Sequence, residues 1–308
     1  MNDKIERRIK LFNEKKTISQ IVKITGDSFD SVWSVRKRYS HLIPEHIVAS
    51  QRYLVNDDFF DVINSEIKAY LLGFFLADGC IDGSLGKSKQ RPFSERLMVN
   101  ISDCDLNVIQ LFKEYVCPGA DIKLRHTQLG VKFYRKPQYT VRWTSKYMTE
   151  TLITKYNMFR RKAYHPEFIF PFELIPIEFQ RDFIRGYFDG DGNVDFAKML
   201  TKNGIETTRF QYGFVFNSPL FAKQVSDIIC NITEGVSGSI VKSKGKTTDW
   251  WTLRFNTYRI KSVEKRYAFY EWLYKDSHFY LTRKKEKFDS FFEYRAKNGY
   301  NIPLQCNA

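Results

Sequence analysis

The spacing of apolar residues changes from a helical period to a strand period and back, twice along the chain. One apolar helical run ends at residue 78 and another at residue 191, and alternation of apolar and polar positions follows each run. The alternating stretches, typical of half-buried strands, are 95–102, 120–128, 138–144, 209–217, 240–244 and 250–256. Amphipathic helices are predicted at 105–116, 146–156, 220–232 and 262–274. With a further strand counted directly after each apolar run, where the alternation begins, the order helix, two strands, helix, two strands, helix occurs twice and predicts an α+β fold of two αββαββα units.

The two apolar runs end in similar stretches, at 71–79 and 184–192. Each stretch ends in an acidic residue followed by glycine, and glycine commonly ends a helix because it enters the left-handed region without strain. We therefore expect the helices to end at Asp78 and Asp191. Small residues recur four positions apart in both copies, which places them on one face of each helix. These small residues are Gly73, Ala77, Gly186 and Gly190.

The small-residue faces predict that the two helices pack closely, because small side chains let two backbones approach. Such packing would place Asp78 and Asp191 side by side. Two neighbouring carboxylates repel each other, and both would lie at negative helix ends. The arrangement requires a cation, and a divalent metal ion is the natural candidate.

The charge of the chain favours a polyanionic partner. Its 308 residues include 49 Lys and Arg against 35 Asp and Glu, a net charge of +14. Scattered cysteines without a C-x-x-C pair argue against a zinc site or a disulfide framework and favour a reducing cytosol. No apolar stretch is long enough to span a bilayer, and we expect no signal peptide. The alternative is a basic soluble protein with no such partner.

Residues 1–45 are predicted to form a separate all-α unit of three helices. Thr17 would cap the second helix, Gly26 would end it, and the third would span 28–39. The stretch 17–39 looks like a helix-turn-helix, and the alternative is a helical hairpin that packs on the main domain. The residues expected to face DNA bases or phosphates in this unit are Ser31, Ser34, Arg36 and Lys37.

The chain is expected to divide into this unit, a linker at 46–65, and two domains at 66–165 and 166–308.

The stretches 71–79 and 184–192 resemble the motif of the LAGLIDADG homing endonuclease family, specifically its single-chain members with two motifs. The second stretch matches closely, whereas the first has Leu76 where the family usually has aspartate but keeps Asp78. The resemblance implies tandem LAGLIDADG domains related by pseudo-twofold symmetry, which form a β-saddle over a DNA duplex. It further implies a monomeric, sequence-specific endonuclease that makes a staggered double-strand break. The tail at 280–288 also looks like those of bacterial and phage members.

The resemblance also implies a metal site. Asp78 and Asp191, with the backbone at Ala77 and Gly190, would hold Mg²⁺, and Mn²⁺ or Ca²⁺ are alternative occupants. Asp189 corresponds to Leu76 in the first copy, so a structural hydrogen bond is expected for it rather than a symmetric catalytic role.

The family also places a basic residue near each acid, at the last junction between strand and helix. Lys146 follows Asp78, and Lys261 follows Asp191, at nearly equal separations along the chain. Each would polarise the attacking water or stabilise transition-state charge. The alternative is that both lysines are ordinary surface residues. Polar candidates for lining the site on the second strands are Ser102, Asn217 and Ser218.

Each predicted sheet has one apolar face and one polar, basic face. A solvated outer face is one explanation, since antiparallel sheets often have one. Lys, Arg, Gln, Asn and Thr are also the side chains that hydrogen-bond base edges in the major groove. On that interpretation the DNA-contacting residues are Arg96, Asn100, Lys123, Arg125, Gln138, Thr140 and Arg142 in the first unit and Arg209, Gln211, Lys242, Lys244, Thr252 and Arg254 in the second.

The leading hypothesis is therefore a Mg²⁺-dependent homing endonuclease acting on double-stranded DNA in the cytoplasm of a bacterial or phage-host cell, or in an organelle. The alternatives are a non-cleaving binder of nucleic acid, such as an intron RNA maturase or a transcription regulator, and a protein that both cuts DNA and assists splicing. The chain does not begin with Cys or Ser and ends in Asn307-Ala308, so the splicing ends of an intein are not expected.

Overall fold

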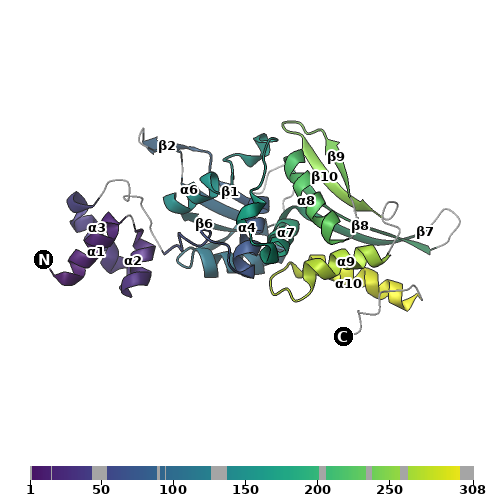
Figure 1. Cartoon of the computed structure of the whole chain (residues 1–308), viewed down its shortest axis with the longest axis horizontal. Coiled ribbons are helices and arrows are strands. Elements are labelled where there is room, and N and C mark those ends of the chain that lie inside the picture. The colour runs from purple at the N-terminus through teal and green to yellow at the C-terminus, as the bar shows by residue number, and fades with distance from the viewer. Residues whose placement is uncertain are drawn as a thin grey trace. The chain divides into compact units, whose positions relative to one another are not determined.

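The computed structural model describes residues 2–14, 16–43, 54–88, 91–93, 95–125, 137–200, 206–233, 238–256 and 263–298. The chain forms two compact units (Figure 1). The first consists of Met1–Val62 and Gly79–Tyr156, and the second of Ile63–Asp78 and Asn157–Ala308. The first apolar helix therefore belongs to the same compact unit as the second. Within the described ranges, every helix is too short or too polar to traverse a lipid bilayer.

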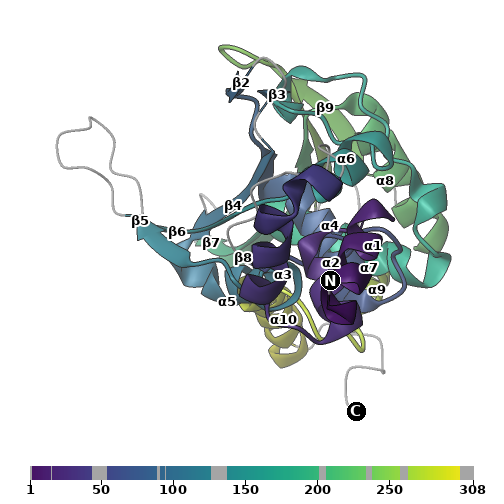
Figure 2. The same cartoon turned by 90° about the vertical axis from the view of Figure 1, so that its left-hand side faces the viewer.

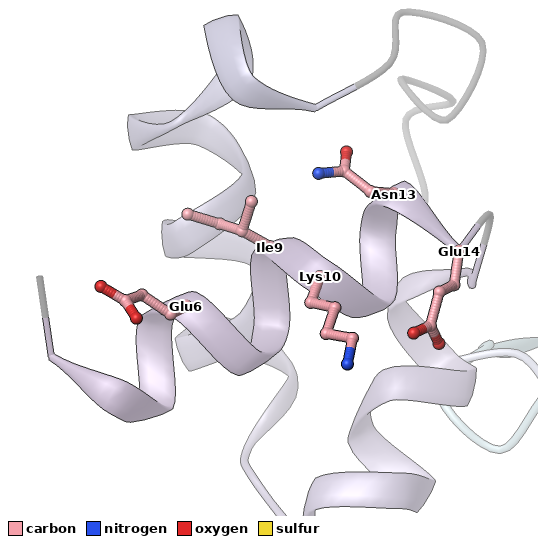
Figure 3. Close-up of a pocket in the computed structure, with 5 residues that line it drawn as sticks. All are labelled: Glu6, Ile9, Lys10, Asn13 and Glu14. Carbon is pink, nitrogen blue, oxygen red and sulfur yellow. The ribbon is translucent and has the colours of Figure 1, made fainter.

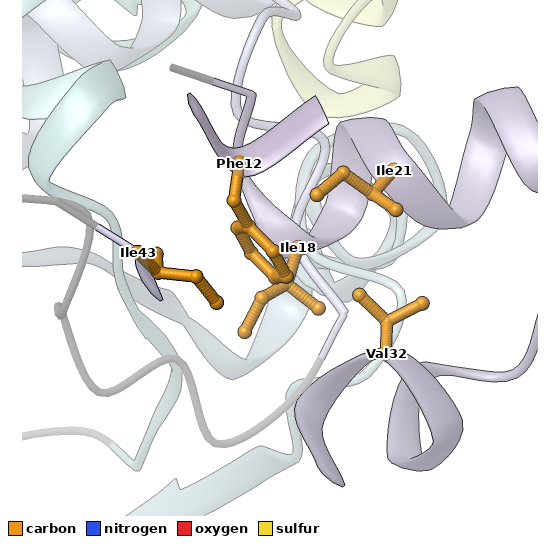
Figure 4. Close-up of a cluster of buried hydrophobic side chains, with 5 residues drawn as sticks. All are labelled: Phe12, Ile18, Ile21, Val32 and Ile43. Atoms are coloured by element: carbon orange, nitrogen blue, oxygen red, sulfur yellow. The ribbon is translucent and has the colours of Figure 1, made fainter. Parts of the chain in front are cut away.

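Three helices at the amino-terminal end pack against one another (Figure 2). They are α1 (Asp3–Asn13), α2 (Ile18–Thr25) and α3 (Phe29–Arg38), followed by the 3₁₀ helix η1 (Ser40–Leu42). The predicted ends of α2 are confirmed, because Thr17 and Gln20 form a reciprocal capping box and Gly26 is left-handed with φ 70°. The buried side chains that hold the helices together are Phe12, Ile18, Ile21, Val32 and Ile43 (Figure 4).

The first unit also contains a four-stranded antiparallel sheet with strand order β1-β4-β6-β5. On β4 and β6 the buried apolar residues are Leu97, Val99, Ile101, Val141 and Trp143, and the residues between them point to the other face, which confirms the predicted alternation. A separate two-stranded ribbon, β2-β3, was not predicted. The elements are β1 (Gly79–Ile81), β2 (Leu85–Ser88), β3 (Arg91–Phe93), β4 (Arg96–Ser102), η3 (Asp103–Asp105), α5 (Leu106–Leu111), the π-helical turn η4 (Phe112–Val116), β5 (Ile122–Arg125), β6 (Gln138–Thr144) and α6 (Lys146–Thr154).

The second unit has a sheet with strand order β7-β8-β10-β9 and a core rich in aromatic rings. Along β8, Phe210 stacks on a ring of α10, Tyr212 on a ring of α9, and Phe216 packs edge-on against a ring of α8, so these helices cover one face of the sheet. The elements are α4 (Glu66–Asp78), η5 (Lys162–Tyr164), η6 (Phe172–Leu174), α7 (Ile177–Asp191), β7 (Gly192–Leu200), β8 (Glu206–Phe216), α8 (Pro219–Ile232), β9 (Ser239–Ser243), β10 (Trp250–Asn256), α9 (Val263–Tyr274) and α10 (Thr282–Lys297).

The two sheets share one topology. Leaving the β2-β3 ribbon aside, each sheet orders its strands first, second, fourth, third along the chain, and each begins directly after an apolar helix that ends in aspartate. The predicted α+β fold with a duplicated unit is therefore confirmed, with a helical region before it. The domain boundaries at 45, 65 and 165 stay predictions.

Candidate active site

The two apolar helices, α4 and α7, meet through their glycines. A Cβ atom on Gly73 would lie 2.0 Å from the carbonyl oxygen of Phe183, and one on Gly186 would lie 2.0 Å from the carbonyl oxygen of Tyr70. No side chain fits at either distance, so glycine is required for the backbones to approach this closely. The contact is reciprocal, because each helix supplies one glycine and one carbonyl. The predicted packing of the two helices is confirmed.

The same packing brings the carboxyl ends of the helices together. A Cβ atom on Gly190 would lie 2.3 Å from the Cβ of Ala77 and 3.3 Å from Oδ2 of Asp78. Asp191 directly follows Gly190 as the last residue of α7, and both aspartates are half-buried. The two acids therefore lie where the helices meet.

The glycines that follow the two acids do not act as left-handed helix ends, contrary to the prediction. Gly192 has extended backbone angles, φ −88° and ψ 158°, and both Gly79 and Gly192 begin strands. Among the described glycines, Gly26 alone has a positive φ. Glycine is needed at 192 for another reason, because a Cβ there would lie 2.3 Å from the carbonyl oxygen of Phe188.

The electrostatics of the aspartate pair favour a cation. Burial raises the pKa of Asp191 to about 6, the nearby charge of Asp78 adds to the rise, and the ammonium groups of Lys162 and Lys284 oppose it. An ionised pair at two negative helix ends is therefore costly in the folded protein. A bound cation would offset this cost.

Lys284, at the start of α10, is buried against the carboxyl end of α7. Its Nζ donates to the backbone carbonyls of Phe188 and Gly192, both at 2.6 Å, and of Asp189 at 2.7 Å. Burial lowers the pKa of Lys284 to about 8, although the charge of Asp189 opposes the shift. This side chain supplies the donors that the last turn of α7 otherwise lacks.

Lys162, at the start of η5, holds α4 in the same way. Its Nζ donates to the carbonyl oxygen of Leu76 at 2.7 Å and to that of Ala77. Each acid-bearing helix therefore ends on a lysine that follows it in the chain. The sequence offered a signal for this pair, because the dipeptide Arg-Lys occurs at both places, as Arg161-Lys162 and Arg283-Lys284.

Replacing Lys284 with methionine should lower the free energy of unfolding by about 2–4 kcal/mol, because buried carbonyls would lose their donor. Urea denaturation of both proteins measures the change. Lys223→Met is a matched control, since that lysine is exposed and pairs with Asp227 on the same helix, and it should cost less than about 1 kcal/mol. Equal losses in the two variants would contradict the role given to Lys284.

Asp189 has the structural role expected for it. Its Oδ2 accepts hydrogen bonds from the hydroxyl of Tyr70 at 2.9 Å and from the backbone N–H of Leu281 at 2.8 Å. The buried guanidinium of Arg185 adds a second link, at 2.7 Å from Glu66 and 2.9 Å from Asp182. Together these contacts connect α4, α7 and the segment before α10.

Lys146 and Lys261 were predicted to be catalytic. Lys146 is the first residue of α6, in the first compact unit, and its Nζ lies 3.5 Å from Glu150 on the same helix. Lys261 lies outside the described residues. Their catalytic roles stay predictions.

Of the polar candidates on the second strands, two have local structural roles. Ser218 is buried, donates to the carbonyl oxygen of Phe168 at 2.6 Å, and caps α8. Ser102 donates to the carboxylate of Asp103, the next residue. The side-chain amide of Asn217 donates to the carbonyl oxygen of Lys162, so it supports the segment that carries this lysine.

The polar face of the first sheet matches the prediction, with one correction. Arg96, Lys123, Arg125 and Gln138 are exposed, and Asn100 and Arg142 are partly exposed. Thr140 is buried, because it lies on a central strand between two neighbours, and its hydroxyl donates to Oδ1 of Asn100 at 2.6 Å. Thr140 therefore orients Asn100 and is poorly placed to contact a ligand itself.

The polar face of the second sheet needs two corrections. Arg209 and Arg254 are exposed and Gln211 is partly exposed, but Thr252 is buried on the central strand β10. Lys242 pairs in register with Trp251, so it projects from the helix-covered face, with its Nζ 5.5 Å from that ring and 2.7 Å from Asp249. Its assignment to the polar face was wrong. Lys244 is exposed after the end of β9.

In the amino-terminal unit, α3 presents Ser31, Ser34 and Lys37 at positions three apart, on one side of the helix. Arg36 does not share that side, because it is buried with its guanidinium 5.0 Å from the Trp33 ring. Arg36 is therefore poorly placed to contact phosphate, and its predicted contact stays a prediction. A hollow in this unit is lined by Glu6, Ile9, Lys10, Asn13 and Glu14 (Figure 3). All five belong to α1 or its end, so the hollow is a stretch of helix surface.

No protein-family model matches the chain, and no curated protein matches its sequence significantly. Solved structures of similar fold include the I-SmaMI LAGLIDADG homing endonuclease bound to cleaved DNA, with 13% identity, a TM-score of 0.47, and coverage of 77% of this chain and 92% of that chain. The LAGLIDADG homing endonuclease I-GzeII in complex with its DNA target has 12% identity, a TM-score of 0.48, and coverage of 79% and 94%. Similarity this distant does not transfer an activity, so the chemistry depends on the residues described above.

Proposed function

We propose that this protein is a sequence-specific, Mg²⁺-dependent DNA endonuclease of the homing type, which makes a staggered double-strand break. One observation carries the proposal: Asp78 and Asp191 end two helices that touch backbone to backbone, and both acids lie at that contact. A fold that only needed two packed helices would gain stability from neutral residues there. Two acids at a costly position are typical of a functional site.

The residues present fit magnesium. Among the described residues, no three or more metal-ligating side chains cluster. Mg²⁺ is usually held by one or two carboxylates, with water and substrate phosphates completing its octahedron, so Asp78 and Asp191 are sufficient protein ligands. The carbonyl oxygen of Ala77 accepts a hydrogen bond from Lys162, and that of Gly190 accepts one from Lys284 Nζ at 3.4 Å. Because a carbonyl oxygen has two lone pairs, each can also accept a hydrogen bond from a metal-bound water.

Each side chain then has a distinct task. When bound, the metal supplies an activated water and stabilises charge on the phosphate undergoing attack. Asp78 and Asp191 bind it, one from each motif helix. Lys162 and Lys284 keep the two helix ends in place beside it. Lys146 and Lys261 are proposed to stabilise the charge that develops on the phosphate.

DNA binding is proposed for the polar faces of the two sheets. The net charge of +14 supplies affinity for the phosphate backbone without sequence preference. Exposed arginine, lysine, glutamine and asparagine side chains on the strands supply donors and acceptors for base edges. The three amino-terminal helices, as a helix-turn-helix through α3, would add contacts outside the region covered by the sheets.

The test has two stages. A random double-stranded DNA library is first selected for binding without divalent metal, and the selected duplexes are then incubated with Mg²⁺. The wild-type protein should cut both strands, and Asp78→Asn should bind the same duplexes but cut at least about 1000-fold more slowly. Asp227→Asn is the matched control, because Asp227 is an exposed carboxylate that pairs with Lys223 on α8. Specific binding without cutting by the wild type would favour the non-cleaving alternative instead.

A further inference from the structure

The second sheet carries a row of apolar side chains on its otherwise polar face. Val215 on β8, Thr252 on β10 and Val241 on β9 are cross-strand neighbours. Val215 and Val241 are 36% and 40% exposed, and Trp250, two residues before Thr252 on the same face, is 40% exposed. Single exposed apolar residues are common on protein surfaces. Here three exposed apolar residues surround Thr252 on one face of the sheet, and such a cluster needs a reason.

The row lies close to the aspartate pair. The carbonyl oxygen of Val215 accepts a hydrogen bond from the hydroxyl of Tyr187 at 2.8 Å. Tyr187 is one turn before Asp191 on α7. A base pair read by Val215 therefore lies near the proposed cutting position, and Val241, two strands away on β9, reads a base pair farther from it.

The first sheet has a polar row at the equivalent place. Gly79 pairs with Val99 as Gly192 pairs with Phe214, so the next residue along β4 corresponds to Val215. That residue is Asn100, and it leads across the sheet to Thr140 and Lys123. Both rows have a buried threonine at the centre. The flanking positions differ, with Asn100 and Lys123 in one row and Val215 and Val241 in the other.

The two rows suit different base edges. In the major groove, the methyl group of thymine is the apolar feature that a base pair displays, and apolar side chains contact it. Valine offers neither a donor nor an acceptor, so it can recognise a base only through such a contact. Asparagine and lysine instead donate to the acceptors of purines.

On the basis of the proposed function, we propose that Val215 and Val241 read thymine methyl groups in the part of the DNA site bound by the second sheet, with Val215 on the base pair nearer the cut. In the part bound by the first sheet, Asn100 and Lys123, at the corresponding strand positions, read hydrogen-bond acceptors. The target is therefore asymmetric at its centre, with thymine preferred on one side only.

Deoxyuridine tests this directly, because it lacks the methyl group of thymine but keeps its hydrogen-bonding edge. Two random duplex pools, one made with thymidine and one with deoxyuridine, are selected on wild-type protein without divalent metal. The thymidine pool should yield sites with thymine near the centre of one half. Replacing each such thymine by deoxyuridine should weaken binding about fourfold per methyl group, and the deoxyuridine pool should lose the preference.

A double variant gives a second, independent test of the thymine preference. Val215→Asn with Val241→Lys copies the first row into the second sheet, and it should lose both the thymine preference and the sensitivity to deoxyuridine. Because the uridine comparison uses unaltered protein, it stands even where the variant folds poorly. A selected site that binds equally well with deoxyuridine throughout overturns this inference alone. A failure to select any sequence overturns the proposed function itself.

Discussion

Replacing Asp191 with asparagine should abolish DNA cleavage and also stabilise the metal-free protein at neutral pH. Burial raises the pKa of Asp191 to about 6, so keeping it ionised in the fold at pH 7 is unfavourable. The difference between this pKa and the ordinary aspartate value corresponds to about 2–3 kcal/mol. Asparagine has nearly the same shape without the charge, so the variant should gain part of this energy and lose the metal ligand.

The pH dependence gives the sign of the effect. Because the pKa is raised in the folded state, the folded protein holds the Asp191 proton more tightly than the unfolded chain does between about pH 4 and 6. The destabilisation is therefore absent below the unfolded pKa and fully present above the folded pKa. Stability gained by Asp191→Asn should be largest at pH 7 and disappear near pH 4.

Urea denaturation in the presence of EDTA, at pH 7 and again at pH 4.5, measures the gain, and the Mg²⁺ assay on selected duplexes measures cutting. Asp227→Asn, at an exposed ion pair, should change neither by much. A variant of Asp191 that cuts normally would remove this residue from the metal site. A variant that is no more stable at pH 7 than the wild type would mean that its burial carries no cost.

The second large effect is expected at the helix contact. Gly186→Ala should lower the free energy of unfolding by about 3 kcal/mol or more, although alanine is the better helix former. The added Cβ would lie 2.0 Å from the carbonyl oxygen of Tyr70, and a backbone atom cannot rotate away as a flexible side chain can. The helices must separate, which would also move Asp191 from its place beside Asp78.

Chemical denaturation of Gly186→Ala against Gly26→Ala separates packing from backbone conformation. Gly26 has φ 70° but nothing within 4 Å of an added Cβ, so alanine there should cost only about 1–2 kcal/mol, the strain of the left-handed conformation. Cleavage should be lost with Gly186→Ala and retained with Gly26→Ala. Similar losses of stability in both variants would contradict a close helix contact.

Those features of the site that depend on a single helix could be predicted from the repeated motif. Where the helices end, which faces are small and where the acids lie all follow from residues within nine positions, and the structure agrees. Lys162 and Lys284 were not foreseen as parts of the site, because a lysine in a sequence is usually at the surface. Only the path of the chain after α6 brings Lys162 against the end of α4, and only the path after α9 brings Lys284 against the end of α7.

The sheet faces show where alternation is an insufficient guide. The face of Lys242 could not be assigned from the sequence, because Ile240 and Val241 are both apolar and the stretch does not alternate; its pairing with Trp251 decides it. Thr140 and Thr252 were placed on the correct face, but their burial depends on having neighbours on both sides. The residues of one strand do not show which strands will lie beside it, so this burial could not be predicted from the alternation alone.

The reciprocal contact between Gly73 and Gly186 makes the seam between the two motif helices self-complementary. A single copy of the repeat would therefore present a surface able to pair with a second copy of itself, as in a twofold-symmetric contact. The reciprocal glycine contact also implies that one repeat could be exchanged for the corresponding repeat of another protein. A half from another two-motif chain should dock here if it has glycine at the matching position, because backbone shape rather than particular side-chain pairs defines the joint.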